Sequence, residues 1–378
     1  MTLEQEKKAA NALYGHAGGI SEKTSLQLSL LKVISCIAVI YVHSYTPQYE
    51  FFAAAMNKMP LFHYTSEIIS KFIALTAVPV FFMVSGIIYF SRQYQCGVFE
   101  FAVRKFRSVL LPYLLWNSIA IAYISIAQLP DKVRQIFPPD KVIANFSAGD
   151  WLNAYIGWGN NWFPFLYPLW FLPCLFAVFM IVHIFRKYFY RWNWPIWLLT
   201  GVNIIGFAYI PLYRQIDSCG PWLRLVYSLA FFTLGKLFWE HKKLSGNLLV
   251  LPVSGVVFSA AVILSFCNPC PDIKWLIFAL YAGMFFILCL SGWIVEKCRR
   301  LNKYIVFLAG FSFVVYLTHE FALTALLTLI YPLLPMRTGV FMTVYLLLPL
   351  LLASGLITGG WLLKKLLPKV YAFLFSNR

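Results

Sequence analysis

Charged residues are scarce in this sequence: they make up only 12% of its 378 residues, and only 14 residues are acidic. A soluble protein of this length carries about twice that share of charge. Hydrophobic residues make up 61% of the chain, and they come in long blocks instead of alternating with polar residues. The scarcity of charge therefore excludes a soluble globular enzyme and predicts an all-α polytopic membrane protein.

Long polar segments are also lacking, so the sequence predicts no second, soluble domain. We expect about ten transmembrane helices, at roughly 25–45, 68–90, 108–128, 165–185, 194–212, 222–239, 247–266, 275–294, 304–331 and 339–363. The expected organisation is a cytoplasmic tail over 1–24, one ten-helix domain over 25–363 that includes an outer-side loop at 129–164, and a cytoplasmic tail over 364–378. No cleavable signal peptide and no internal repeat is visible in the sequence.

Acidic residues are too few to balance the bases, and a net charge of +17 would by itself suit a nucleic-acid partner. With the N-terminus placed in the cytoplasm, however, 20 of the 31 Lys and Arg residues fall on the cytoplasmic side and eight on the outer side. This asymmetry is the one that the positive-inside rule describes. The excess of bases therefore predicts the orientation in the membrane, with both termini cytoplasmic, and implies no nucleic-acid partner.

The first apolar segment contains two ionisable residues, Lys32 and His43. Together with Ser29 and Cys36 they fall on one face of a helix, which we expect to point into the bundle because lipid does not tolerate it. His43 lies about 16 Å along the axis from Lys32, near the outer end. An imidazole with a pKa of roughly 6.5 suits a general base. The alternative is that Lys32 reaches the cytoplasmic headgroups and His43 forms a hydrogen bond at the outer interface.

A second polar group lies in the segment "FSFVVYLTHEF", residues 311–321. Tyr316 and His319 share one helix face, and Glu320 is adjacent, so a carboxylate and an imidazole lie within a span. Ionisable groups inside a membrane are functional candidates by default. A buried hydrogen-bond network that joins two helices is the alternative interpretation.

A third feature is "FEFAVRKFRSVLLPYLLW", residues 99–116, which enters a predicted span from the cytoplasm. Arg104 and Arg107 lie one turn apart there, on one face of the predicted helix. Guanidinium groups bind phosphate through paired hydrogen bonds, so the pair suits a phosphate-bearing ligand. The alternative is an ordinary basic anchor at the cytoplasmic interface.

These segments, in this order, resemble the acyltransferase 3 family of integral-membrane O-acyltransferases. The opening segment "SLQLSLLKVISCIAVIYVHSY" is similar to the family's first helix, which ends in the histidine matched by His43. The other matches are "PVFFMVSGIIYF" to a Phe-Phe-x-x-Ser-Gly element that includes Ser85 and Gly86, "FAVRKFRSVLLPYLLW" to an Arg-x-x-Arg stretch followed by Pro-Tyr, "PLWFLPCLF" to a Trp-Phe-Leu helix start, "FFTLGKLF" to a late glycine-containing helix, and "FSFVVYLTHEF" to a Ser…Tyr-Leu-x-His helix.

The resemblance implies transfer of an acyl group, commonly acetyl, from cytoplasmic acyl-CoA to a hydroxyl of a carbohydrate or glycolipid at the outer face. It implies an integral protein of a bacterial inner membrane, a monomer or homodimer in contact with membrane lipid, with acyl-CoA as donor substrate and no metal. Under this resemblance His43 is the catalytic residue, and Arg104 and Arg107 bind the donor. As hypotheses of our own we add catalytic roles for His319 and Glu320, donor binding by Lys32 and Ser85, and acceptor binding by Tyr316, Trp170 and Trp162. The alternative for tryptophans near the outer loop is the interfacial aromatic belt.

The chain departs from the family pattern in the first helix. Many relatives have Leu-Asp-x-x-Arg where this sequence has Leu28, then Ser29, then Lys32, so the aspartate is missing and the support of His43 stays open. Direct attack by the acceptor and an acyl-histidine intermediate are both open as well. So is a disulfide among the outer cysteines.

Two other function classes fit the same composition. One is a transporter or flippase for a lipid-linked sugar, since proton relays use the same intramembrane residues. The other is an acyltransferase-like protein that has lost catalysis. The feature that discriminates is the pair Arg104 and Arg107, because an enzyme that uses CoA needs such a pair and a flippase for an uncharged sugar does not.

Overall fold

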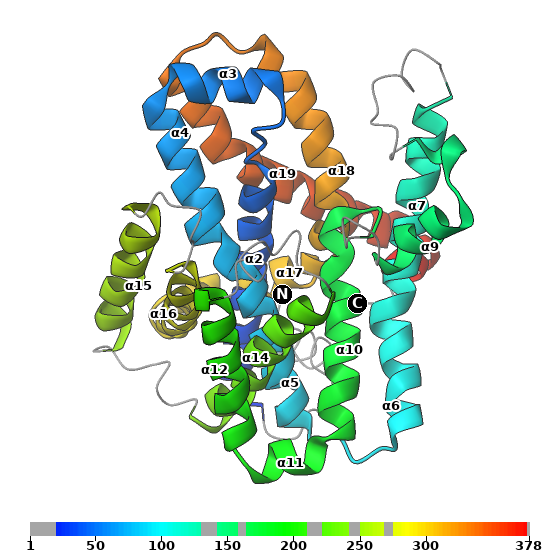
Figure 1. The fold of residues 1–378 in the computed structure, drawn as a ribbon, viewed down its shortest axis with the longest axis vertical. Coiled ribbons are helices and arrows are strands. Elements are labelled where there is room, and N and C mark those ends of the chain that lie inside the picture. Colours follow the sequence, from blue (N-terminus) through cyan, green and yellow to red (C-terminus); the bar gives the residue numbers. More distant parts are fainter. Residues whose placement is uncertain are drawn as a thin grey trace. The chain divides into compact units, whose positions relative to one another are not determined.

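The structure is a computed structural model that describes residues 20–129, 142–157, 164–209, 221–241, 250–267 and 275–375. Within these residues every regular element is a helix (Figure 1). Eight helical stretches there are long and apolar enough to cross a membrane, which confirms an all-α polytopic membrane protein. They are Glu22–His43, Pro60–Arg92, Val98–Ala127, Tyr167–Ile184, Val250–Cys267, Leu276–Lys297, Ser312–Leu333 and Thr338–Leu366. The predicted spans at 194–212 and 222–239 correspond to α12 (Trp194–Tyr209) and α14 (Pro221–Glu240).

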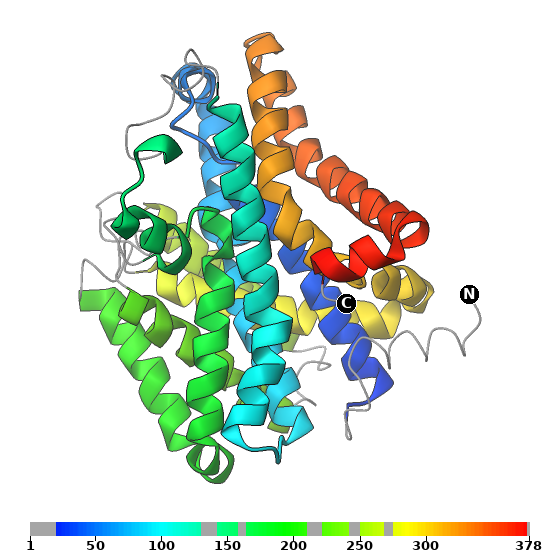
Figure 2. The ribbon, with the colours of Figure 1, turned by 90° about the vertical axis from the view of Figure 1, so that its right-hand side faces the viewer.

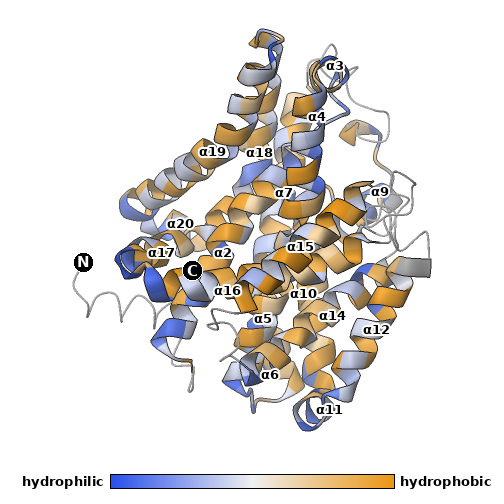
Figure 3. Cartoon of the chain, turned by 90° about the vertical axis from the view of Figure 1, so that its left-hand side faces the viewer, coloured by the Kyte–Doolittle hydropathy of each residue, from blue (hydrophilic) through white to orange (hydrophobic). Residues whose placement is uncertain are grey.

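The described residues divide into two compact units. Unit 1 takes 20–94 and 231–371, and unit 2 takes 95–230 and 372–375. Hydrophobic residues predominate along the long helices, and hydrophilic residues gather in short segments such as α11 and α17 (Figure 3). This distribution is the one expected for helices that cross a lipid bilayer.

Unit 1 is built on α2 (Glu22–His43), a helix that is buried along most of its length. The Ser21 hydroxyl caps its first turn by accepting a hydrogen bond from the Thr24 amide. The helices that pack on α2 are α5 (Ala77–Arg92), α16 (Leu276–Lys297), α17 (Asn302–Ala309), α18 (Ser312–Ile330) and α19 (Thr338–Leu366). Figure 2 shows α18 and α19 side by side, in orange and red. Polar residues in α2 therefore face other helices.

The sequence missed two helices in the segment that follows His43. The segment between the expected spans at 25–45 and 68–90 contains α3 (Glu50–Lys58) and α4 (Pro60–Glu67). α4 then continues into α5 through a π-helical turn at Ile68–Ile73 and a 3-10 turn at Ala74–Thr76. Proline at the start of α4 is compatible with a helix because the first turn needs no amide donor. Burial fixes both helices, since Phe52 of α3 and Phe62 of α4 are fully buried.

The prediction of one continuous helix over 304–331 is wrong. α17 ends at Ala309, and α18 begins at Ser312 after a break at Gly310 and Phe311. Glycine weakens a helix interior, and the Phe311 backbone leaves the helical region. The Ser312 hydroxyl donates to the Ala309 carbonyl at 2.9 Å, which joins the two helices across the break.

Two segments of the family resemblance meet within unit 1, at the crossing of α5 and α14. A Cβ atom on Gly86 would lie 1.9 Å from the carbonyl oxygen of Phe232, and one on Gly235 would lie 2.6 Å from that of Met83. Only glycine fits at such a backbone contact, as in other closely packed membrane helices. The Phe-Phe-x-x-Ser-Gly element and the late glycine-containing helix are therefore two sides of one contact.

Unit 2 contains α6 (Val98–Lys105), α7 (Leu111–Ala127), α9 (Ala148–Ile156), α10 (Phe171–Ile184), α11 (Arg186–Arg191), α12 and the first part of α14. α20 (Pro368–Phe375) ends in unit 2, whereas α15 (Val250–Cys267) belongs to unit 1. The segment 99–116, which was expected to lead into a span, contains a π-helical turn at Phe106–Leu110. Pro112 follows directly and has no amide hydrogen for the carbonyl four residues earlier, which favours an irregular turn there. Arg107 lies in this turn and Arg104 in α6.

Candidate active site

His43 and Glu320 face one another in unit 1. His43 is the last residue of α2, and its Nδ1 lies 3.4 Å from Oε2 of Glu320, which α18 carries. The two side chains are 16% and 29% exposed, so the pair is partly shielded from solvent but open to a reactant. The distance allows an ion pair, and such contacts in unliganded sites commonly shorten when a reactant binds.

The pair arises from the register of α2 and α18. Cys36 Sγ donates to the Ser312 carbonyl at 3.2 Å, which aligns the middle of α2 with the first turn of α18. Seven residues further along the two helices lie His43 and His319, and their ring centroids are 5.3 Å apart. Seven residues make about two turns, so each helix returns to the same face. The face of α2 predicted from sequence thus packs on α18 through Cys36 and His43.

His319 is 1% exposed, and its protonation can be read from its contacts. Its Nδ1 lies 2.8 Å from the Tyr316 carbonyl oxygen, which can only accept, so Nδ1 carries the hydrogen. Nε2 is then an acceptor, and in the described part of the chain this buried atom has no hydrogen-bond partner. A buried polar atom without a partner is uncommon and is typical of a site that a ligand or water completes.

The three side chains are also a metal-ligand set by residue type. One ligand atom each from His43, His319 and Glu320 lie within 4.8 Å of one another. Ligand atoms around a tetrahedral zinc ion stand roughly 3.3 Å apart, given bonds of about 2.0 Å. His43 Nδ1 and Glu320 Oε2, at 3.4 Å, are close to that spacing, so the set fits a metal ion by residue type as well as hydrogen-bonded proton transfer through a reactant.

An apolar cluster in unit 1 includes residues of both helices that carry the site. Cys36 and Ile40 of α2 and Leu323 of α18 belong to it, together with Phe52 of α3 and Phe341 of α19. Electrostatic interactions are stronger in such surroundings than in water. The Coulombic attraction between charged His43 and Glu320 is therefore stronger here than at an exposed site, although burial also costs both groups hydration.

Tyr49 is a neighbour of the site that sequence reasoning missed. It precedes α3, and its ring stacks on Phe51 with 5.4 Å between centroids and 8° between planes. Burial, and then the Glu320 carboxylate, raises the pKa of the Tyr49 phenol. The available signal was the spacing of Tyr41, Tyr45 and Tyr49, which repeats every four residues around His43.

The other predicted site residues of unit 1 are Tyr316, Ser85 and Lys32. Tyr316 is 9% exposed, with its ring 6.3 Å from those of His319 and Phe81. The Ser85 hydroxyl donates to the Phe81 carbonyl of its own helix at 2.8 Å. Lys32 is half-buried on α2, about 16 Å along the axis from His43.

The missing aspartate of the first helix has no bearing on the contact at His43. Ser29 occupies its position and is buried, at 1% exposed. It lies 14 residues before His43, or about 21 Å along α2. A side chain there could not reach His43, and the carboxylate that faces the imidazole comes from Glu320 of α18 instead.

Unit 2 contains the arginine pair and the described tryptophan. Arg104 forms an ion pair with Glu100 one turn earlier in α6, and Arg107 is exposed in the π-helical turn. Trp170 is 9% exposed, and the Arg224 guanidinium lies 5.8 Å from its ring centroid. Trp162 lies outside the described residues.

A buried histidine positions the helix that carries Arg104. His183 of α10 stacks on Phe101 of α6, with 3.9 Å between centroids and 10° between planes. Arg186 Nη1 lies 2.8 Å from His183 Nε2 and 3.1 Å from the Cys96 carbonyl oxygen. Nε2 of His183 also lies 3.2 Å from the Cys96 carbonyl oxygen, so this nitrogen stands between a donor, the Arg186 guanidinium, and an acceptor. His183 therefore has a packing role between α6 and α10.

A family model described as an acyltransferase domain matches residues 26–364 of the chain, from α2 to the end of α19. No curated protein and no solved structure matches. The match covers most of the 378 residues and includes both the His43–Glu320 pair and the arginine pair. The chain belongs to the acyltransferase 3 family, and it is a membrane acyltransferase.

Proposed function

We propose that the protein transfers an acyl group, most simply acetyl, from cytoplasmic acyl-CoA to a hydroxyl of a carbohydrate or glycolipid at the outer face of a bacterial inner membrane. The observation that carries the proposal is the His43–Glu320 contact at 3.4 Å beside the buried acceptor atom of His319. A carboxylate, an imidazole and a further acceptor form an acid–base set suited to activating a hydroxyl.

The geometry supports a separate role for each nitrogen of His43. Because Glu320 faces Nδ1, the carboxylate favours a hydrogen on that atom and leaves the lone pair on Nε2. Nε2 then takes the proton of the acceptor hydroxyl while the oxygen attacks the thioester carbonyl carbon. The carbon–sulfur bond breaks, and the His43 imidazolium returns the proton to the departing thiolate, so the products are an ester and free CoA.

An acyl-histidine route uses the same arrangement. In that route Nε2 of His43 attacks the thioester first, and the acceptor hydroxyl then attacks the acyl-imidazole. Glu320 stabilises the positive charge that develops on His43 in either case. The Nε2 atom of His319 would accept a hydrogen bond from the acceptor and so orient it.

Replacing Glu320 with glutamine tests the carboxylate. We expect Glu320→Gln to lower the turnover number about 100-fold or more, because the neutral amide no longer stabilises the imidazolium, and to leave the KM for acetyl-CoA unchanged. Glu320→Asp should recover part of the lost rate, since it restores the charge at a longer distance. The measurement is CoA release from acetyl-CoA by membranes that contain the protein and its natural acceptors. A matched control is Glu50→Gln, an exposed carboxylate at the start of α3. Equal rates for Glu320→Gln and Glu50→Gln would remove Glu320 from the mechanism.

The donor site is tested by the arginine pair of unit 2. We expect Arg104→Ala/Arg107→Ala to weaken acetyl-CoA binding at least tenfold, because each charge-assisted hydrogen bond to phosphate contributes about 1.5–3 kcal/mol. Arg107→Ala alone should account for most of the loss, since Glu100 pairs with Arg104. Calorimetry with purified protein measures the binding, and Lys187→Ala/Arg191→Ala in α11 removes two bases as a control. If neither pair changes the affinity, the donor phosphates bind elsewhere.

A further inference from the structure

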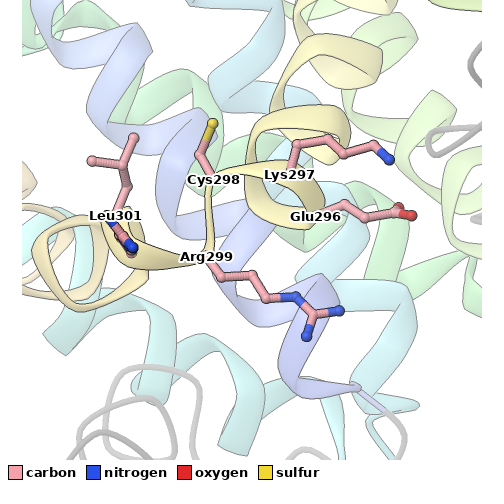
Figure 4. Close-up of a pocket in the computed structure, with 6 residues that line it drawn as sticks. Glu296, Lys297, Cys298, Arg299 and Leu301 are labelled. Carbon is pink, nitrogen blue, oxygen red and sulfur yellow. The ribbon is translucent and has the colours of Figure 1, made fainter.

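A second group of bases lies in unit 1, outside the site already described. It follows α16 directly, where Glu296, Lys297, Cys298, Arg299, Arg300 and Leu301 line an open pocket of about 540 Å³. That volume falls within the range of roughly 300–1,000 Å³ that small-molecule sites occupy. Figure 4 shows the Lys297, Glu296 and Arg299 side chains extending in the same direction from the turn.

The charge of this pocket is not balanced by the chain. Its acidic member, Glu296, forms an ion pair at 2.7 Å with Lys23, the second residue of α2. No ion pair involves Lys297, Arg299 or Arg300 within the part of the chain that the structure describes. Three bases therefore line a pocket whose carboxylate is already paired with Lys23. Guanidinium and ammonium groups in this arrangement favour a phosphate group.

The pocket also lies at the depth of lipid headgroups. Lys297 ends a helix that is long and apolar enough to cross the membrane, so the residues that follow it stand at the edge of the hydrocarbon region. Leu301, which lines the pocket, is 46% exposed, and two aromatic residues a few positions away in the sequence are exposed too, Trp293 at 37% and Tyr304 at 55%. Trp and Tyr prefer the membrane interface, where one end of the ring meets acyl chains and the other meets water.

We propose that this pocket binds the phosphate group of an anionic membrane lipid, with Lys297, Arg299 and Arg300 as its ligands. The basic groups take the headgroup phosphate, and the exposed apolar side chains contact the upper part of the acyl chains. A soluble phosphate compound offers the same charge but no acyl chains, so the apolar rim of the pocket favours the lipid. Lys23 contributes indirectly, because its ion pair with Glu296 offsets a negative charge that would otherwise repel the phosphate.

The test uses purified full-length protein with defined lipids, and native mass spectrometry to count the lipids retained. We expect the wild-type protein to retain phosphatidylglycerol in preference to phosphatidylcholine. Arg299→Ala/Arg300→Ala should lose one bound phosphatidylglycerol, with an affinity lower by about fivefold per base, or roughly 30-fold for the pair. Arg299→Lys/Arg300→Lys should keep part of the affinity, since the charge remains and the paired hydrogen bonds do not.

The matched control removes two bases elsewhere in unit 1. Lys364 and Lys365 end α19 and lie over aromatic rings, Lys364 at 5.1 Å from Tyr371 and Lys365 at 5.3 Å from Trp361. We expect Lys364→Ala/Lys365→Ala to retain the bound lipid. Equal loss in both variants would mean a diffuse attraction to the surface and would overturn the pocket. Displacement of the lipid by adenosine 3′,5′-bisphosphate at micromolar concentration would overturn the lipid assignment in favour of a soluble phosphate ligand.

Discussion

His43→Ala is expected to lower acyl transfer by about 10²–10⁴-fold and to leave acetyl-CoA binding unchanged. The imidazole faces Glu320 through Nδ1, so its removal leaves the acceptor hydroxyl without a base and the carboxylate without a partner. The measurement is acetyl transfer from labelled acetyl-CoA into the carbohydrate and lipid fractions of membranes, alongside calorimetry of acetyl-CoA binding to purified protein.

The matched control for this prediction is His241→Ala. His241 is an exposed residue at the end of α14, and its Nδ1 lies 3.0 Å from the Leu237 carbonyl oxygen, a local contact with no link to the site. This variant should transfer acetyl groups at the wild-type rate. A His43→Ala protein that binds acetyl-CoA and transfers at the rate of the control would show that His43 is not the base, and His319 would then be the remaining imidazole.

Binding and turnover of acetyl-CoA, measured together, also separate the function classes. A transporter that performs no chemistry would release no CoA, and loss of His43 would then change transport of the sugar without any effect on acetyl-CoA. A protein that has lost catalysis would bind acetyl-CoA and fail to turn it over in the wild-type form. Only an active acyltransferase separates binding from turnover at His43 in the way that we expect.

Much of the site could be predicted from the spacing of residues along the helices. Cys36 and His43 are seven residues apart, as are Ser312 and His319, and two turns of helix bring each pair to one face. The sequence therefore placed these residues on faces, but it could not say that the two faces meet. That contact depends on the break at Gly310 and Phe311, which sets where α18 begins relative to α2.

Other parts of the structure depend on contacts between distant segments, so the local sequence pattern indicates them less clearly. α3 and α4 are short and are fixed by burial of Phe52 and Phe62 against α18 and α19, so local periodicity did not reveal them. The Glu320 carboxylate raises the pKa of Tyr49, a residue 271 positions earlier in the sequence, so this proximity also depends on the fold. The carboxylate that faces His43 likewise belongs to Glu320, 277 positions later in the chain, whereas the pattern of the first helix indicated only a missing aspartate.

The family elements that contain Gly86 and Gly235 have a structural explanation that their sequences do not reveal. Each glycine places its Cα against backbone atoms of the partner helix, and backbone cannot rotate away as a side chain can. α5 also carries Phe81, which contacts the ring of Tyr316 beside His319. Separation of α5 from α14 would therefore affect both the stability of unit 1 and the packing next to the site.

Gly86→Ala is accordingly expected to be among the most destabilising single substitutions in the protein. The added Cβ would lie 1.9 Å from the Phe232 carbonyl oxygen, so the helices must move apart by about 1 Å, and the lost packing costs 3 kcal/mol or more. Gly235→Ala should behave alike, with contacts of 2.5–2.7 Å. The checks are the yield of monodisperse protein in detergent and its midpoint of thermal unfolding.

The control for this effect lies in α19. Gly355 and Gly359 are helical, and an added Cβ at either position would meet nothing within 4 Å. Gly355→Ala and Gly359→Ala should therefore be neutral or slightly stabilising, because alanine favours a helix over glycine by about 0.5–1 kcal/mol. The four variants make the same chemical change, so a difference between the two pairs isolates the α5–α14 contact from helix propensity. If Gly86→Ala unfolds at the temperature of Gly355→Ala, the close approach of the two helices is wrong, and with it the explanation for both glycine elements.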